Sequence, residues 1–275
     1  KYQEKLIQII ESGEYKIIPD FRKNEVLSFL KSGLQDISIS RTNERAKNWG
    51  VPVPGDQTQR IYVWFDALNI YQSGIGFGWD EDRYKKWWPA DLHVIGKGIL
   101  RFHAVYWPAI LLSAGLSLPK ELFVHEYFTV NGQKMSKTLG NVYDPNIAIE
   151  KYGADALRYF CLAKISPFQD GDFSEEKLKD VYNADLANGL GNLVARVAKL
   201  CETNSVIVNS ARQSLDPKMT IHLENYKFNE ALSHIWGEIT EADKKVNEKK
   251  PWELSGEKLD EVLQDLIKKV QHIAF

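Results

Sequence analysis

The sequence predicts an α/β domain over residues 1–172, followed by an all-helical domain over residues 173–275. In the first part, short apolar β-type runs alternate with helical stretches, a pattern typical of a sheet with parallel pairing. From about Phe173 onward, strand signals nearly disappear and apolar residues recur at helical spacing. The 275 residues, of which 44% are hydrophobic and 26% charged, are enough to bury a core in each part.

Residues 1–33 are predicted to form two amphipathic helices, each ended by a glycine, Gly13 or Gly33. Their apolar faces comprise Leu6, Ile9 and Ile10 in the first helix and Val26, Leu27, Phe29 and Leu30 in the second. Residues 34–60 are polar and contain turn-forming residues, so we expect a loop with short extended pieces.

Three β-type runs follow, at Ile61–Phe65, Leu92–Ile95 and Leu122–Val130. The first run ends at Asp66, which we expect to cap the helix after it. An apolar helix is predicted after the second run, from about Ile99 to Ala114. This alternation of strands and helices favours parallel pairing in one sheet.

The second part contains three long stretches with apolar residues at helical spacing, Ser174–Thr203, Phe228–Lys249 and Lys258–Ala274. We expect these stretches to pack against one another as an all-helical domain. Between the first two, Ser205 to Pro217 is predicted to be a connector.

The composition excludes several classes of protein. The formal net charge of -2 gives no overall basic character, so any contact with RNA must come from a local surface. Cys161 and Cys201 are far apart and form no disulfide framework or zinc motif, which favours a reducing compartment and no zinc site. The most apolar stretch, Val105 to Leu118, falls short of the ~18 residues that a membrane span needs. The chain has no initiator Met, so we expect processing or a cut from a longer protein.

A lysine loop, Asn131 to Asn141, contains Lys134-Met135-Ser136-Lys137-Thr138 between two glycines. Glycine permits loop motion, and lysine supplies a compact positive charge with several donors. Such a loop can close over a triphosphate and stabilise the charge of a leaving pyrophosphate.

Two aromatic stretches, Tyr62–Tyr71 and His93–Pro108, suggest a binding pocket. His103 and Trp107 are four residues apart and therefore share a helix face. Gly96 lies where a strand turns into a helix, a place where backbone can approach a nucleotide. Aromatic rings beside small residues suit an unbranched apolar side chain that carries a polarizable sulfur.

The helical part offers a candidate surface for single-stranded RNA. Asn192 and Arg196 are four residues apart and face the same way. Pro251-Trp252 follows the charged helix end Lys244–Lys250. Bases of single strands are recognised by stacking on aromatic rings and by hydrogen bonds to their edges, and these side chains supply both.

The lysine loop resembles the KMSKS signature of class I aminoacyl-tRNA synthetases, with Thr138 in place of the last serine. The resemblance implies that Lys137 contacts the ATP phosphates with the help of Lys134, and that Ser136 and Gly96 also bind ATP. The two aromatic stretches are similar to segments of methionyl-tRNA synthetases that form the methionine pocket. The implied lining consists of Trp64, Ala67, Tyr71, Phe102, His103 and Trp107.

Two residues depart from that family's pattern. Family members commonly carry proline at the position of Leu68 and an acidic residue at the position of Gly98, which would lie near the ATP. The segment Asn183–Arg196 resembles the start of the family's anticodon-binding helices. By that resemblance, Asn192, Arg196, Pro251 and Trp252 would read the CAU anticodon.

The resemblance therefore implies a partial Rossmann-type catalytic domain followed by a helical-bundle anticodon-binding domain. Its activity would be that of a cytoplasmic methionine–tRNA ligase that uses L-methionine, ATP with Mg²⁺, and tRNA-Met. The HIGH signature and the cysteine-rich zinc insertion of the family are absent from this sequence, so we expect a fragment that is inactive alone. The alternatives are a synthetase of the leucyl, isoleucyl or valyl type, a non-catalytic tRNA-binding protein, and a helical scaffold protein. The sequence leaves the oligomeric state open.

Overall fold

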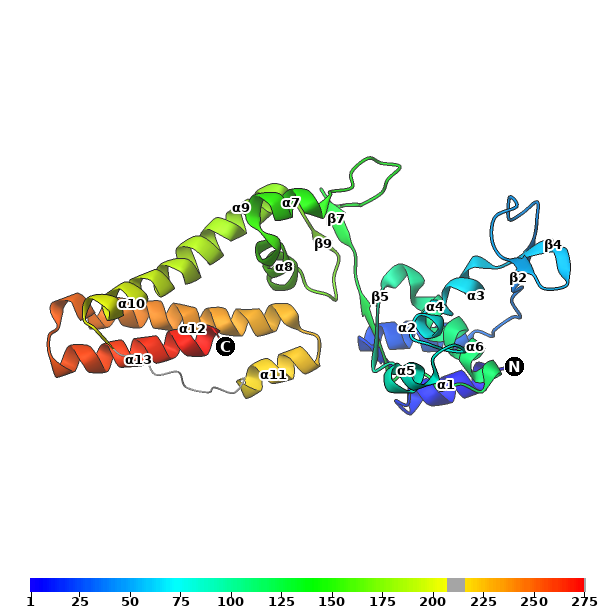
Figure 1. Cartoon of the computed structure of the whole chain (residues 1–275), viewed down its shortest axis with the longest axis horizontal. Helices are drawn as coiled ribbons and strands as arrows, with labels where there is room; N and C mark the ends of the chain where they lie inside the picture. The colour runs from blue at the N-terminus through cyan, green and yellow to red at the C-terminus, as the bar shows by residue number, and fades with distance from the viewer. Residues whose placement is uncertain (207–215, 275) are drawn as a thin grey trace. The chain divides into compact units, whose positions relative to one another are not determined.

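The computed structural model describes residues 1–206 and 216–274, so most of the predicted connector Ser205–Pro217 lies outside the described residues. The chain divides into two compact units, Lys1–His125 (unit 1) and Glu126–Phe275 (unit 2) (Figure 1). The two units are defined by how densely residues pack within each of them. The predicted functional boundary between residues 172 and 173 remains a prediction.

Unit 1 is built on a parallel three-stranded sheet. Its strand order is β1 (Lys16–Ile18), β6 (Glu121–His125), β5 (Leu92–Gly96). Both pairs of neighbours are parallel. The predicted pair of helices is confirmed as α1 (Gln3–Glu11) and α2 (Asp20–Lys31). Strand β1 lies between them and was missed, because three residues are too few to show a strand period.

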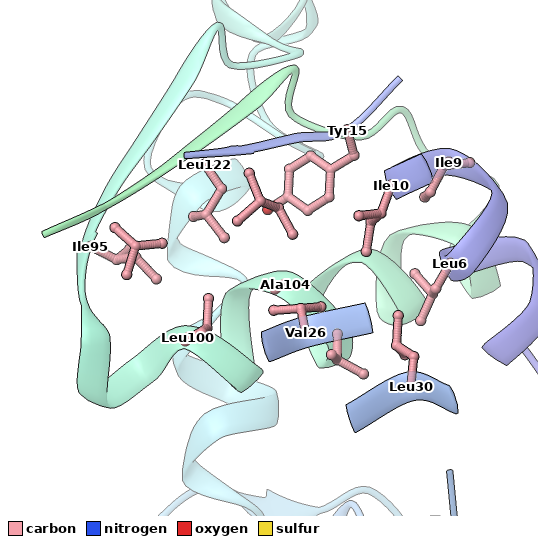
Figure 2. Close-up of a cluster of buried hydrophobic side chains, with 13 residues drawn as sticks. Leu6, Ile9, Ile10, Tyr15, Val26, Leu30, Ile95, Leu100, Ala104 and Leu122 are labelled. Atoms are coloured by element: carbon pink, nitrogen blue, oxygen red, sulfur yellow. The ribbon is translucent and has the colours of Figure 1, made fainter. Parts of the chain in front are cut away.

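The core of unit 1 lies between this sheet and its helices. Figure 2 shows Tyr15 and Leu122 extending from the sheet side toward Ala104, with α1 and α2 residues closing the other side. Leu6, Ile9 and Ile10 are fully buried, as their helical spacing predicts. The Tyr15 hydroxyl donates to the backbone oxygen of His103 at 2.9 Å, which ties this core to the segment that carries the aromatic site residues.

A second, antiparallel sheet in unit 1 corrects one prediction. Its order is β2 (Ser40–Thr42), β4 (Asp56–Ile61), β3 (Pro52–Val53). The predicted strand Ile61–Phe65 is wrong, because β4 ends at Ile61 and α3 (Val63–Ala67) follows. Asp66 lies exposed inside α3 and caps nothing, since the residue before the helix is Tyr62. A short apolar run is compatible with either structure, and here the run turns helical so that Trp64 can pack on Phe102.

The remaining elements of unit 1 form a helical layer. They are α4 (Ile70–Ser73), α5 (Glu81–Trp87), η1 (Lys97–Ile99), η2 (Phe102–Tyr106) and α6 (Trp107–Ala114). The predicted helix from Ile99 to Ala114 is therefore present, but its middle segment η2 is a π-helix. The predicted strand Leu122–Val130 is interrupted, since β6 ends at His125 and the next strand begins at Phe128.

Unit 2 begins with a small mixed sheet of order β8 (Gln133–Lys134), β7 (Phe128–Val130), β9 (Gly171–Asp172). β7 pairs antiparallel with β8 and parallel with β9. Two helices, α7 (Pro145–Tyr152) and α8 (Ala154–Ala163), connect β8 to β9. Phe160, Phe173 and Leu178 form the buried centre of this region.

The rest of unit 2 is helical in the described residues, as predicted. Figure 1 shows one continuous helical run made of α9 (Glu175–Val181), η3 (Tyr182–Gly191) and α10 (Asn192–Thr203). It is followed by α11 (Pro217–Glu224), α12 (Phe228–Lys249), η4 (Pro251–Glu253) and α13 (Glu257–Ala274). A common core of Leu193, Val197, Ile239, Val246 and Leu263 holds α10, α12 and α13 together. Within the described parts of the chain, no helix is long and apolar enough to cross a membrane.

Candidate active site

An aromatic cluster in unit 1 surrounds His103. The Tyr71 hydroxyl lies 2.8 Å from His103 Nε2, and His103 Nδ1 lies 3.0 Å from the backbone oxygen of Ile99. A carbonyl oxygen only accepts, so Nδ1 carries the proton and Nε2 accepts from Tyr71. Burial lowers the pKa of His103, which agrees with this neutral form. The pair is therefore an uncharged polar group inside an aromatic surround.

Three further rings complete the cluster. Trp64 stacks on Phe102, with ring centroids 4.0 Å apart and planes 14° from parallel. Trp107 is fully buried, its ring centroid lies 6.1 Å from that of Tyr71, and its Nε1 has no hydrogen-bond partner among the described residues. Five of the six residues predicted for the methionine pocket therefore lie together, from α3, α4, η2 and α6.

Ala67 is the sixth predicted residue, and the structure leaves it exposed on α3. Its neighbour Leu68 is buried instead and packs with Trp88, Trp107 and Leu111. Leu68 is one of the positions at which this chain departs from the pattern that the sequence resembles. The departure thus supplies apolar packing beneath the cluster.

His93 was missed as a member of this cluster. It is 5% exposed on β5, and its ring centroid lies 4.4 Å from that of Tyr71. Burial, with a smaller effect of the nearby His103, lowers its pKa to about 4. The alternation of buried His93, exposed Val94 and buried Ile95 is an ordinary strand period, and this pattern could have identified His93 as inward-facing.

A small cavity adjoins one edge of the cluster. Its volume is about 10 Å³, and it is lined by Ile37, Tyr62, Trp64, Phe65, Leu68, Tyr106 and Ile110. A cavity of that size is at the lower limit for one water molecule, so it is too small to hold a methionine side chain.

Gly96 ends β5 at its carboxyl end, in extended conformation (φ -80°, ψ 151°) and half-buried. In parallel α/β sheets, ligands bind beyond the carboxyl ends of the strands. Gly98 lies two positions further on in η1 and is exposed.

The lysine loop of unit 2 is a β-hairpin at its base. Asn131 and Gly132 both have positive φ, 53° and 71°, and they join β7 to β8 with Val130 opposite Gln133. Asn-Gly is the preferred pair for a two-residue hairpin turn, because both positions need positive φ. The Asn-Gly dipeptide by itself therefore indicates a hairpin at this point of the sequence.

Asn141 closes the loop. The Ser136 N–H donates to Asn141 Oδ1 at 2.8 Å, and Asn141 Nδ2 donates to the Lys134 backbone oxygen at 3.2 Å. Lys134 Nζ lies 4.9 Å from the centre of the Tyr127 ring, a cation–π contact. Lys137 is exposed and forms no ion pair with any residue that the structure describes. One lysine is therefore partly anchored, and the other is available to an anion.

Asp172 anchors the base of the hairpin. Its Oδ1 accepts from the Gly132 N–H at 2.8 Å and from the Thr129 hydroxyl at 2.9 Å, and its Oδ2 lies 2.9 Å from Lys177 Nζ. These donors, the Gly132 N–H foremost, lower the pKa of Asp172 to about 2. Neither Asp172 nor the role of Asn141 was anticipated from the sequence.

The third group of predicted residues lies on the helices of unit 2. Arg196 on α10 donates to Asp243 Oδ1 and to Asn247 Oδ1 of α12, both at 2.8 Å. Asn192, one turn earlier, is exposed. Pro251 is buried, whereas Trp252 is 56% exposed, and both lie in η4, which directly follows α12. The structure thus connects Arg196 to the helix that leads into Trp252.

The parallel sheet of unit 1, the lysine hairpin and the helical run after it are features of class I aminoacyl-tRNA synthetases. Comparison with known proteins supports this class, because the sequence model of the family tRNA synthetases class I (M) matches residues 1–198. The chain belongs to this family, the methionyl-tRNA synthetases. The family membership disfavours the leucyl, isoleucyl and valyl alternatives.

Relatives with this similarity carry the name methionine–tRNA ligase. The protein of Thermotoga maritima is 44% identical over 271 residues, covering 94% of this chain and 43% of the relative. That of Clostridium acetobutylicum is 41% identical over 296 residues, covering 100% and 45%. The Mycobacterium tuberculosis methionyl-tRNA synthetase bound by methionyl-adenylate aligns with a TM-score of 0.87 and 38% identity, covering 99% of this chain and 57% of that chain. The chain spans about half the length of the curated relatives it matches.

Proposed function

We propose that this chain is the C-terminal part of a cytoplasmic methionine–tRNA ligase, which activates L-methionine with ATP and transfers it to tRNA-Met. Unit 1 would contribute methionine recognition, and unit 2 would contribute phosphate stabilisation and anticodon recognition. In this proposal, residues 1–172 are part of a Rossmann-type catalytic domain and residues 173–275 are the anticodon-binding helical bundle. The observation that carries the proposal is the neutral Tyr71–His103 pair within an aromatic cluster.

Methionine recognition follows from the chemistry of that cluster. Sulfur makes favourable contacts with aromatic rings, and an unbranched side chain can enter between them. A neutral His103 leaves no buried charge to oppose the thioether, and the Tyr71 hydroxyl hydrogen-bonds to His103 beside it. The proposed lining is Trp64, Ala67, Tyr71, Phe102, His103 and Trp107. Trp64, Tyr71 and Phe102 are half-buried whereas His103 and Trp107 are buried, so the first three rings are the ones that can shift when methionine enters.

Phosphate stabilisation follows from the lysine loop. During activation, the methionine carboxylate attacks the α-phosphate of ATP and pyrophosphate leaves with the displaced negative charge. Lys137, aided by Lys134, would stabilise this charge, and Ser136 and Gly96 would contact the nucleotide. Mg²⁺ would enter bound to ATP and neutralise part of the phosphate charge. The exposed Lys137 side chain suits this role, because a free ammonium can turn toward the phosphates.

The Lys137→Ala substitution in the complete enzyme tests the phosphate role. Loss of one charge that acts in the transition state lowers the rate by roughly 10²–10³-fold. We therefore expect pyrophosphate exchange to fall by about this factor, while methionine affinity stays within about twofold. Lys179→Ala, an exposed lysine of α9 in the same unit, is the matched control. An exchange rate within a few-fold of wild type for Lys137→Ala would contradict the proposal.

The same assay applied to the 275-residue chain alone tests the fragment hypothesis. We expect no exchange above background, because the family's HIGH segment is absent from this sequence. Full exchange by the chain alone would show that the residues present suffice for activation.

Anticodon recognition would use Trp252 for stacking, beside Asn192, Arg196 and Pro251. Stacking of a base on an aromatic ring is worth about 1–3 kcal/mol by alanine substitution. Trp252→Ala should therefore weaken tRNA binding about tenfold or more, measured by filter binding, and leave methionine activation by the complete enzyme intact. Equal losses of tRNA binding and activation would assign Trp252 a folding role instead. Tyr182→Ala, another exposed aromatic residue of unit 2, serves as the control.

A further inference from the structure

A group of side chains that could ligate a metal ion lies in unit 2, apart from the residues described above. The His/carboxylate cluster consists of Asp216, just before α11, His234 and Glu238 on α12, and His272 on α13. One ligand atom each from Asp216, Glu238 and His272 lies within 4.8 Å of the other two. His234 Nε2 lies 3.2 Å from Asp216 Oδ2 and 3.9 Å from Glu238 Oε1, and His272 Nε2 lies 3.5 Å from Glu238 Oε2.

Three separations within the cluster approach the spacing of ligands around zinc. Tetrahedral Zn²⁺ with bonds of ~2.0–2.1 Å holds neighbouring ligand atoms about 3.3 Å apart. The distances between imidazole and carboxylate atoms are 3.2, 3.5 and 3.9 Å. The Glu238 carboxylate faces two imidazoles from different helices, His234 through Oε1 and His272 through Oε2. Asp216, Glu238 and His272 each have a ligand atom within 4.8 Å of the other two, and imidazole nitrogen with carboxylate oxygen is a donor set that Zn²⁺ commonly accepts.

The fold orients these ligands before any ion arrives. The Lys218 N–H donates to Asp216 Oδ1 at 2.6 Å, so the carboxylate caps α11 and leaves Oδ2 toward His234. His234 and Glu238 are four residues apart, so both side chains project from one face of α12.

Space for an ion is also present. A cavity of about 90 Å³ is lined by Glu238, Glu241, Lys269, His272 and Ile273. That volume exceeds the ~10–15 Å³ that one water molecule needs. The cavity adjoins the cluster at Glu238 and His272 and is not lined by Asp216 or His234. Glu241 adds a further carboxylate to its lining, and Lys269 adds one opposing charge.

We propose that Asp216, Glu238 and His272, with His234 held against Asp216, form a structural Zn²⁺ site that joins the start of α11 to α12 and α13. This proposal departs from the expectation from the sequence that the chain holds no zinc, which rested on its two distant cysteines. Histidine and carboxylate ligands contributed by three separate helices leave no compact ligand motif in the sequence. The inference does not depend on the proposed ligase activity.

Zinc titration of the untagged 275-residue chain tests the site. After treatment with a chelator, calorimetry with Zn²⁺ in excess Mg²⁺ should show one ion bound per chain. Glu238→Gln and His272→Gln should each weaken Zn²⁺ binding by at least about tenfold, since even substitutions that only orient metal ligands cost 10–100-fold. His222→Gln is the matched control, because His222 pairs with Glu230 at 3.3 Å outside the cluster. Wild type and this control should bind Zn²⁺ equally.

Two further measurements distinguish loss of the zinc site from loss of the fold and report the coordination of the bound ion. Far-UV circular dichroism at the titration temperature separates loss of the site from loss of the fold in each variant. Co²⁺ added to the wild-type chain should give the intense visible absorption of a four-coordinate site, and Zn²⁺ should displace it. The proposal is overturned by an absence of Zn²⁺ binding, by binding that both substitutions leave unchanged, or by an equal loss in His222→Gln.

Discussion

The aromatic cluster of unit 1 and the lysine loop of unit 2 differ in burial and in polarity. The cluster consists of packed rings around a neutral histidine, with Trp107 and His103 buried. The loop is polar and mostly exposed, and a few hydrogen bonds from Asn141 and Asp172 hold its shape. Recognition of an apolar side chain requires removal of water and therefore packing, whereas stabilisation of a transient charge requires a free cation that can move to it.

The two regions should accordingly differ in how they respond to pH. The pKa of His93 in the folded protein is about 4, below the ordinary value of 6.5. As pH falls, the unfolded chain takes up this proton first, so the stability contributed by neutral His93 is complete above pH ~6.5 and is lost as pH falls toward 4. The loss in the free energy of unfolding of unit 1 should reach the order of 3 kcal/mol. Guanidinium unfolding followed by tryptophan fluorescence at pH 7 and pH 4.5 measures it.

His93→Phe isolates this contribution, because it keeps an aromatic ring against Tyr71 and removes the titrating group. The variant should lose much less stability than wild type between pH 7 and pH 4.5. Asp172 behaves differently, since its folded pKa of about 2 lies below the ordinary 3.8 and its contribution is lost only as pH falls from ~3.8 toward 2. An unchanged slope in His93→Phe above pH 4.5 would show that other groups set the pH response.

Tyr71→Phe probes the polar pair within the apolar cluster. The substitution removes the hydroxyl that donates to His103 and leaves a buried acceptor without a partner, which costs about 1–3 kcal/mol. In the complete enzyme we expect methionine KM to rise about tenfold with kcat nearly unchanged, measured by pyrophosphate exchange. Tyr84→Phe is the control, because the Tyr84 hydroxyl accepts from Gln72 outside the pair. Equal changes in both variants would indicate a general loosening of unit 1.

The sequence predicted elements with a strong period and missed those that depend on distant contacts. The apolar faces of α1 and α2 follow helical spacing and are buried as predicted. The run Ile61–Phe65 has no period that separates strand from helix, and in the fold most of it is helical, with Trp64 stacked on the distant Phe102. The aromatic residues brought together around His103 were predicted by resemblance, not by spacing.

Residues that act through long-range contacts were the hardest to predict. Asp172 reaches the hairpin turn from β9, and Tyr15 reaches the His103 carbonyl from the start of the chain. Nothing local in the sequence marks either contact. By contrast, the Asn131-Gly132 turn was marked locally, since that dipeptide favours a two-residue hairpin wherever strands flank it.

The smallest expected effect on stability is that of removing the Asn141 hydrogen bonds within the lysine loop. Asn141→Ala removes two hydrogen bonds near the surface, one from the Ser136 N–H and one to the Lys134 oxygen, and should change the free energy of unfolding by less than about 0.5 kcal/mol. The backbone N–H of Ser136 should nevertheless lose its protection, measured by hydrogen exchange of the peptide that contains it. Asn146→Ala removes a contact with Asp144 alone and should leave that exchange unchanged. Equal exchange of Ser136 in wild type and Asn141→Ala would mean that the hairpin base at Asp172, rather than Asn141, sets the shape of the loop. The lysine loop and the packed cluster of unit 1 would then differ less in rigidity than these contacts indicate.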